Sequence, residues 1–191
     1  MTQENKTEVQ VGESAPDFVG RDLSGKEVRL SSLIGGRKAL LLFYRGGWCP
    51  FCNEQLAAIA RDYERFQELN AIVVAVSGEV AEKGKDLLQK LHLPFVLLTD
   101  TSFEAIDRYG VRDTNVSEML RARGISQLPK PSAFVIDATG IVRYKYVGKN
   151  APDRPKNEDL LRALGEADKP MEISAKADEG GACELPEGSN R

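Results

Sequence analysis

The sequence predicts an α/β fold in which helices flank a mixed central β-sheet. Two observations carry this prediction. Apolar, β-branched runs alternate with amphipathic stretches in the first half of the chain, and two apolar runs joined by a short turn follow in the second half. Alternation favours parallel strands with helical crossovers, and the later hairpin adds antiparallel strands. The 191 residues suffice for one domain with a full core.

The first ordered elements are short. Residues 17–20 and 27–30 flank the turn cluster Leu23-Ser24-Gly25-Lys26, which predicts a β-hairpin. A serine at position 31 or 32 can cap a short helical turn that ends at the glycine pair 35–36.

Three buried strands and two helices are expected next. Residues 39–44 are continuously apolar, which is typical of a central strand covered on both faces. The helix that follows extends to about residue 69, because apolar side chains recur there at spacings of three and four. Residues 71–76 and 95–98 have the composition of strands, and 79–91 has that of an amphipathic helix.

The second half of the chain contains smaller helices and the hairpin. Thr101 or Ser102 can cap a short helix that ends before Gly110. The remaining expected elements are a helix at 117–123, a hairpin of strands at 132–137 and 141–147, and a helix at 157–164.

The expected domain organisation is one domain with two tails. Residues 1–10 are polar and predict a disordered lead, and residues 11–165 form the domain. Residues 166–191 are acidic, contain few large apolar side chains and predict a mostly disordered tail that carries Cys183.

Charge and hydropathy exclude several function classes. The net charge of −3 gives no nucleic-acid footprint. No segment approaches the roughly 18 apolar residues of a membrane span, and the first residues contain no apolar signal core. We therefore expect a cytoplasmic protein without a membrane or nucleic-acid partner, and nothing in the sequence calls for a cofactor.

The functional prediction rests on Cys49-Pro50-Phe51-Cys52, which directly follows the central strand and the break at Gly46-Gly47. Pro50 suits the first helical turn, so Cys49 lies where unpaired backbone N–H groups and the helix dipole stabilise a thiolate. The thiol pKa should fall below the free value of about 8.5. Since Cys52 can close a disulfide with Cys49, the stretch predicts a redox-active dithiol at the carboxyl end of a strand.

Other interpretations of the dithiol are weaker. A zinc site needs four ligands, and the chain offers only Cys183 and His92 as further soft ligands. A pair of inert buried cysteines does not account for the proline between them at a strand-to-helix turn. We therefore expect no metal.

Several stretches resemble known families. Trp48 with the dithiol resembles the thioredoxin active site, and Pro131 before a strand resembles the cis-proline that lies against the dithiol in that fold. Residues 15–18, 43–50 and 134–137 resemble the peroxiredoxin branch, the AhpC/TSA family. The resemblance covers residues 11–165 and implies a thioredoxin-like fold with an N-terminal hairpin extension.

The sequence departs from the usual peroxiredoxin pattern. With Cys52 on the family's peroxide-reactive cysteine, Arg45 takes the place of its proline and Cys49 that of its threonine. The family's activating arginine falls on Pro131. These departures favour dithiol–disulfide exchange on a peroxiredoxin-like scaffold.

The resemblance implies a thiol-based antioxidant oxidoreductase that reduces disulfides, peroxides or both. Cys49 attacks, Cys52 resolves, and an external thiol reductant such as a thioredoxin system regenerates the dithiol; in the peroxiredoxin register Cys52 attacks instead. Trp48 would cover the dithiol, Arg45 would stabilise a thiolate or oxyanion, and Pro131 would present backbone groups beside the sulfurs. A homodimer is compatible with the resemblance. The alternative is a redox sensor or binding module without turnover.

Overall fold

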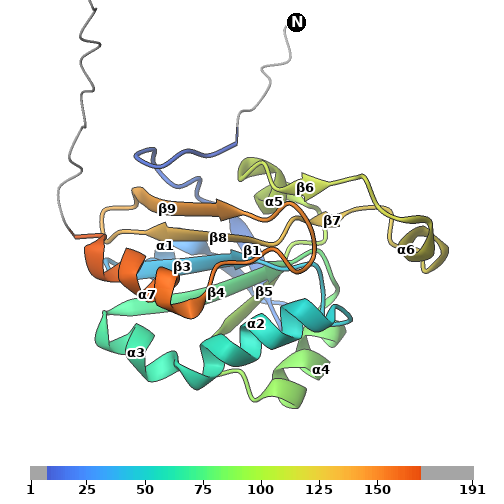
Figure 1. The fold of residues 1–191 in the computed structure, drawn as a ribbon, viewed down its shortest axis with the longest axis horizontal. Helices are drawn as coiled ribbons and strands as arrows, with labels where there is room; N and C mark the ends of the chain where they lie inside the picture. Colours follow the sequence, from blue (N-terminus) through green and yellow to red (C-terminus); the bar gives the residue numbers. More distant parts are fainter. Residues whose placement is uncertain (1–7, 169–191) are drawn as a thin grey trace, which may run out of the picture.

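A seven-stranded mixed sheet forms the centre of the computed structural model, which describes residues 8–168 (Figure 1). In spatial order its strands are β2 (Glu27–Arg29), β1 (Val19–Asp22), β5 (Val96–Thr99), β4 (Ala71–Ser77), β3 (Lys38–Phe43), β8 (Ser132–Ile136) and β9 (Val142–Val147). The three inner strands β5, β4 and β3 are parallel, and all other pairings are antiparallel. The short strands β6 (Arg112–Asp113) and β7 (Leu128–Pro129) pair with each other in a second sheet.

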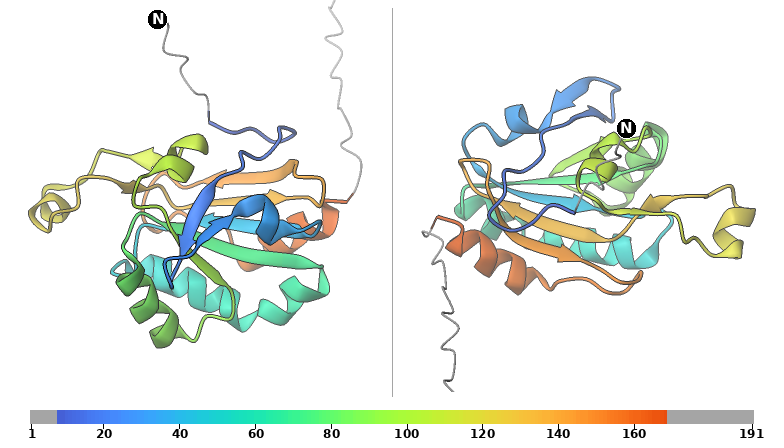
Figure 2. Two further views of the ribbon diagram at one scale, coloured as in Figure 1. Left: turned by 180° about the vertical axis from the view of Figure 1, so that it is seen from behind. Right: turned by 90° about the horizontal axis from the view of Figure 1, so that it is seen from above.

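Helices cover both faces of the main sheet, as the view from above shows (Figure 2). They are α1 (Leu30–Ile34), α2 (Pro50–Arg61), α3 (Tyr63–Glu68), α4 (Ala81–Leu91), α5 (Glu104–Arg108), α6 (Glu118–Ala122) and α7 (Asn157–Glu166). One core lies between the sheet and α2, α3, α4 and α7, and a second lies between the sheet and α1 and α5. Helix α6 projects beyond the end of the sheet (Figure 1). The predicted α/β architecture with its N-terminal hairpin is confirmed.

Strand β3 explains why the central apolar run is continuous. Leu40 and Leu42 belong to the core under α2, whereas Leu41 and Phe43 belong to the core on the opposite face. All four side chains are buried because successive residues of a strand point to opposite faces, and here both faces are covered.

Three predicted boundaries differ from the structure. The helix expected from residue 50 to 69 is interrupted at Asp62, where the backbone leaves helical geometry between α2 and α3. Asp62 accepts a hydrogen bond from Asn157 Nδ2, a contact that the periodicity of the segment does not reveal. Residues 8–10 are part of the fold, since Val9 is buried. At the other end Asp168 pairs with the buried Lys38 at 2.7 Å, so the domain continues beyond residue 165. The rest of both predicted tails lies outside the described residues.

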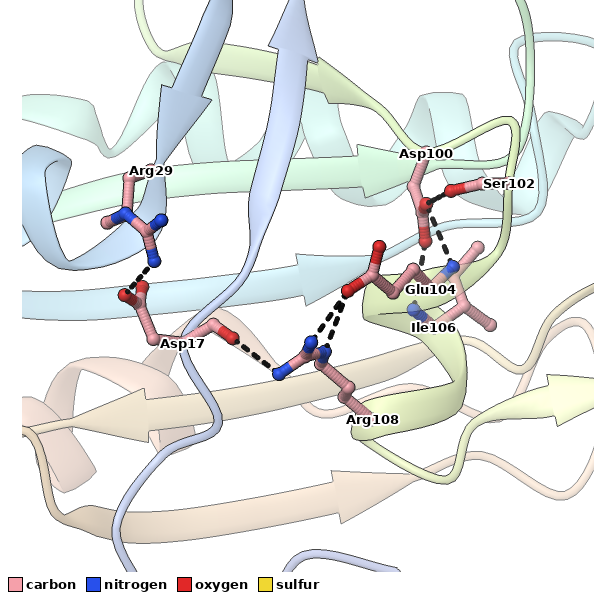
Figure 3. Close-up of polar contacts among 7 residues, drawn as sticks. All are labelled: Asp17, Arg29, Asp100, Ser102, Glu104, Ile106 and Arg108. Atoms are coloured by element: carbon pink, nitrogen blue, oxygen red, sulfur yellow. Dashed lines mark hydrogen bonds and ion pairs between the residues drawn. The ribbon is translucent and has the colours of Figure 1, made fainter.

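The predicted serine and threonine caps are wrong. At α1 the N-cap residue is Arg29, and both serines lie inside the helix. At α5 the carboxylate of Asp100, rather than Thr101 or Ser102, caps the start of the helix. It accepts hydrogen bonds from Ser102 Oγ, Glu104 N and Ile106 N, each at 3.0 Å (Figure 3). Capping by Asp100, the residue directly before Thr101, was not anticipated, because the chain between it and α5 passes through the left-handed backbone of Phe103, which has a φ of 61°.

A second set of contacts ties α5 to the N-terminal segment (Figure 3). Arg108 donates hydrogen bonds to Glu104 and to the main-chain oxygen of Asp17, and the Asp17 carboxylate pairs with Arg29. Burial opposes ionisation of Asp17, but hydrogen bonds from Ser31 and Arg29 outweigh it and lower the pKa of this carboxyl. The hairpin is thereby joined to the face of the sheet that carries α5.

Replacing Asp100 with alanine is expected to lower the free energy of unfolding by about 2–3 kcal/mol, because a buried carboxylate and its three hydrogen bonds are lost and two N–H groups of α5 lose their partner. Urea unfolding monitored by circular dichroism measures the change. Ser102→Ala is the matched control, since it removes only one of the three bonds. An equal loss in the two variants would show that Asp100 does not cap the helix.

Within residues 8–168, no helix combines the length and the apolar character needed to cross a membrane.

Candidate active site

The predicted dithiol lies where strand β3 turns into helix α2. Cys49 is the N-cap residue of α2, Pro50 is its first helical residue, and Cys52 lies in its first turn. Both cysteines are free thiols, and both are buried. The strand, the glycine turn and the helix start are those the sequence predicts.

The two thiols are hydrogen-bonded to each other, and this makes them unequal. The Cys52 thiol and main-chain N–H donate to Cys49 Sγ and, with the charges of Arg45 and Arg154, lower the pKa of Cys49 to about 5 against the opposing effect of burial. The hydrogen bond to Cys49, together with burial, raises the pKa of Cys52. The pair therefore carries one thiolate, on Cys49, and one proton, on Cys52. Such a pair can attack a sulfur or a peroxide oxygen and then close a disulfide.

The reduced protein is expected to contain one thiolate from about pH 5 upward, whereas the unfolded chain forms it only near pH 8.5. The ultraviolet absorbance of the thiolate, measured on reduced minus oxidised protein across a pH series, reports this ionisation. Because the folded pKa lies below the unfolded one, the thiolate stabilises the reduced fold fully above the unfolded pKa. This stabilisation is lost as the pH falls toward 5. If the thiolate absorbance of the native protein rose in a single step with its midpoint near pH 8.5, the hydrogen bond from Cys52 would not be lowering the pKa of Cys49.

Trp48 and Arg45, two of the supporting residues named from the sequence, lie in the turn that leads into the dithiol. Trp48 is partly buried and packs both on the core beneath α2 and on the small apolar cluster next to α6. The guanidinium carbon of Arg45 lies 5.3 Å from the centre of the Trp48 ring, and that of Arg123 lies 5.9 Å from it. Arg45 acts on Cys49 through its charge. Arg123 was not anticipated from the sequence.

Pro131 differs from its prediction. Residues 8–168 contain no cis peptide bond, so Pro131 is trans and the expected cis-proline is wrong. The segment before it is held extended, because β7 pairs with β6 and the Lys130 N–H donates to Val111 O at 2.7 Å. Ser132 pairs with Phe43 across the β8–β3 ladder, which places Pro131 at the same edge of the sheet as the dithiol turn.

Pro131 and Arg45 line an open groove of about 1030 Å³ at this edge. Its lining includes four cationic side chains, Arg45, Lys130, Lys145 and Lys149, and two carboxylates, Glu8 and Asp113. Glu8 pairs with Lys145 at 3.2 Å. The groove is wide enough for more than a small peroxide, and its cationic excess favours an anionic occupant.

Arg154 is the main site residue that the sequence did not reveal. Its Nη2 donates to Cys52 Sγ at 3.0 Å from the loop before α7, 102 positions along the chain. Its Nε donates to Ala151 O, and its Nη1 donates to Gln55 Oε1 on α2. No motif marks this arginine, because its approach depends on how the loop after β9 folds back over α2.

The turn before the dithiol is clamped by two further residues that sequence reasoning missed. Glu79 Oε2 accepts a hydrogen bond from Gly47 N at 2.6 Å, and Asn53 Nδ2 donates to Gly47 O at 3.0 Å. Burial raises the pKa of Glu79. Gly46 has a φ of 145°, and a Cβ there would lie 2.5 Å from the Trp48 indole nitrogen, so this position has no room for a side chain.

The sequence offered two other soft ligands, His92 and Cys183. His92 ends α4 in a left-handed conformation, which is a structural role. Cys183 lies outside the described residues. In residues 8–168 no three His, Cys, Asp or Glu side chains gather as metal ligands.

Comparison with known proteins identifies the family. The model of the AhpC/TSA family matches residues 11–145, which is more than half of the chain. The chain belongs to the AhpC/TSA family. Among curated proteins, it is 32% identical over 152 residues to "Peroxiredoxin Q, chloroplastic" of Oryza sativa subsp. japonica. This match covers 80% of the chain but only 65% of the rice protein.

Two other relatives extend the comparison. "Thiol-disulfide oxidoreductase ResA" of Bacillus cereus is 26% identical over 151 residues, which is 78% of this chain and 77% of that protein. The crystal structure of peroxidoxin BcpB from Mycobacterium tuberculosis superposes with a TM-score of 0.70 at 22% identity, over 81% of this chain and 95% of that one. The AhpC/TSA chain therefore has the thioredoxin-like fold that the sequence predicts.

Proposed function

We propose that this AhpC/TSA protein is a thiol-based oxidoreductase that cycles between a Cys49/Cys52 dithiol and a disulfide. One observation carries the proposal: two free, mutually hydrogen-bonded thiols lie at the start of α2, with one thiolate and one proton between them. An external thiol reductant, such as a thioredoxin system, returns the disulfide to the dithiol. A cytoplasmic location and a homodimer remain predictions.

The proposed cycle has two chemical steps. In the first, the Cys49 thiolate attacks a disulfide and releases one substrate thiolate, or attacks a hydroperoxide to give Cys49 sulfenic acid and an alkoxide that takes up a proton. In the second, Cys52 loses its proton and attacks Cys49 Sγ. The second substrate thiolate, or hydroxide, leaves, and the Cys49–Cys52 disulfide forms. The external dithiol then supplies two electrons and two protons.

Different observations support the two substrate classes. The groove of about 1030 Å³ beside Arg45 supports a disulfide on a polypeptide, since a peroxide would leave most of it empty. The family membership and the similarity to peroxiredoxin Q support a peroxide. The second thiol serves both reactions.

Stopped-flow fluorescence of Trp48 tests the proposal. Trp48 is the only tryptophan of the chain and adjoins Cys49, so its emission should report oxidation. Reduced protein carrying Cys183→Ser is mixed with hydrogen peroxide or with a peptide disulfide, and turnover is then followed with a thioredoxin, its reductase and NADPH. A rapid phase that ends at one equivalent, followed by sustained turnover, is expected with at least one substrate. Oxidation once without turnover would favour a redox sensor, and a rate no faster than that of an ordinary thiol with either substrate would overturn the proposal.

A further inference from the structure

Arg154 contacts the sulfur that reacts second. Its guanidinium is fixed by three hydrogen bonds, to Ala151 O, Gln55 Oε1 and Cys52 Sγ. Cys49, by contrast, receives hydrogen bonds from Cys52. The one direct contact between a cationic side chain and a dithiol sulfur among residues 8–168 is thus made to Cys52, the sulfur that carries the proton in the resting enzyme.

The environment of Cys52 changes when Cys49 becomes bonded to substrate. In the resting state the Cys49 thiolate accepts a hydrogen bond from the Cys52 thiol and repels a second negative charge, and both effects oppose ionisation of Cys52. After the first step Cys49 is uncharged, so both effects end. The groups that still face Cys52 are then Arg154, the Tyr44 phenol and the main-chain N–H of Arg45. The Tyr44 phenol is neutral at ordinary pH, because its pKa is raised to about 12. Among residues 8–168, Arg154 is therefore the one full charge in contact with Cys52.

We propose that Arg154 is a catalytic residue of the second step, in which its guanidinium stabilises the thiolate of Cys52 and directs it at Cys49 Sγ. The inference rests on the proposed dithiol–disulfide cycle and states that different groups activate its two sulfurs. The Cys52 thiol and the start of α2 activate the first sulfur, to which Arg45 and Arg154 contribute only through their charges, whereas Arg154 contacts and activates the second sulfur directly. During the step the Cys52 proton passes to solvent, the S–S bond between Cys49 and Cys52 forms, and the bond from Cys49 to the leaving group breaks. No external oxidant or reductant enters.

The test uses 5,5′-dithiobis(2-nitrobenzoate), a disulfide that reports both steps and does not depend on the physiological substrate. Attack by the first sulfur releases one coloured thiolate, and resolution by the second releases another. In protein carrying Cys183→Ser, Arg154→Gln is expected to leave the first phase within about threefold of its normal rate. It should slow the second about 10- to 100-fold, because a charge-assisted contact to the reacting sulfur is lost. The pH profile of the second phase should move to higher pH, which a purely structural role of Arg154 would not produce.

Three variants complete the design. Arg162→Gln is the matched control, because Arg162 is an exposed arginine on α7 that pairs only with Asp159 in the described structure. Gln55→Ala removes one of the bonds that fix the Arg154 guanidinium and should slow the second phase by a smaller factor. Arg154→Lys keeps the charge and should restore part of the rate. Circular dichroism and thermal unfolding check that each variant is folded.

The outcomes separate this inference from the proposed function. A normal second phase in Arg154→Gln, or an equal slowing of both phases, would overturn the role of Arg154. The wild-type protein settles the function separately: two-phase release from the reagent without turnover of any peroxide or peptide disulfide would reject the proposed function and leave the assignment of Arg154 intact.

Discussion

Replacing Cys49 with serine is expected to lower the rate of turnover by at least about a thousandfold. Cys52→Ser should also lose turnover, but each molecule should still carry out the first step once. A serine hydroxyl does not ionise near neutral pH and cannot form a disulfide, so Cys49→Ser lacks the attacking group. Cys52→Ser keeps the attacking sulfur at the start of α2 but has nothing to resolve the intermediate. Its product with a disulfide is a mixed disulfide on Cys49, which mass spectrometry of the intact protein identifies directly. Its product with a peroxide is a Cys49 sulfenic acid, which mass spectrometry identifies after trapping with dimedone.

The same pair of variants decides which sulfur attacks. In the peroxiredoxin register the roles are exchanged, and Cys49→Ser would retain the single reaction while Cys52→Ser lost it. The lowered pKa of Cys49 and the deeper burial of Cys52 argue against that exchange. A rapid first phase in Cys49→Ser that is absent from Cys52→Ser would contradict this assignment. Cys183→Ser in every protein removes the third thiol from the measurement.

Features determined by adjacent residues were predictable from the sequence. The start of α2 follows from Pro50 after the glycine turn, and the central strand follows from an apolar run buried on both faces. The thiolate at Cys49 follows from the same local geometry, since the Cys52 thiol and main-chain N–H, three positions on in the first turn of α2, both donate to Cys49 Sγ.

Features that depend on distant residues were not predictable. Asp62 interrupts a helix whose periodicity continues, and its carboxylate accepts a hydrogen bond from Asn157, which lies 95 positions away at the start of α7. Arg154 reaches Cys52 from 102 positions away, and Glu79 reaches Gly47 from 32 positions away. Their partners are selected by how the loops pack over α2, and this packing leaves no periodicity or spacing in the sequence.

The loop that carries Arg154 is itself held by a close backbone approach, which gives the last prediction. A Cβ at Gly148, just after β9, would lie 2.2 Å from Asp153 O and 3.1 Å from Pro131 O. Both are main-chain atoms and cannot rotate aside, and Gly148 N already donates to Pro131 O at 2.8 Å. Gly148→Ala is therefore expected to lower the free energy of unfolding by about 1–3 kcal/mol, measured by urea unfolding. It should also displace Asp153 and the adjacent Arg154, and so slow the second phase with the aromatic disulfide as Arg154→Gln does.

The matched control for Gly148→Ala is Gly165→Ala in α7, where an added Cβ meets no atom within 4 Å. Alanine is the better helix former, so this variant should gain about 0.5–1 kcal/mol and leave both kinetic phases unchanged. The double variant Gly148→Ala/Arg154→Gln separates strain from the loss of the arginine. If the backbone clash acts on the chemistry only by moving Arg154, the second phase of the double variant should be no slower than that of Arg154→Gln alone. If the second phase of Gly148→Ala kept the wild-type rate, the loop could shift at residue 153 without moving the Arg154 guanidinium away from Cys52, and the expected effect on the chemistry would be wrong.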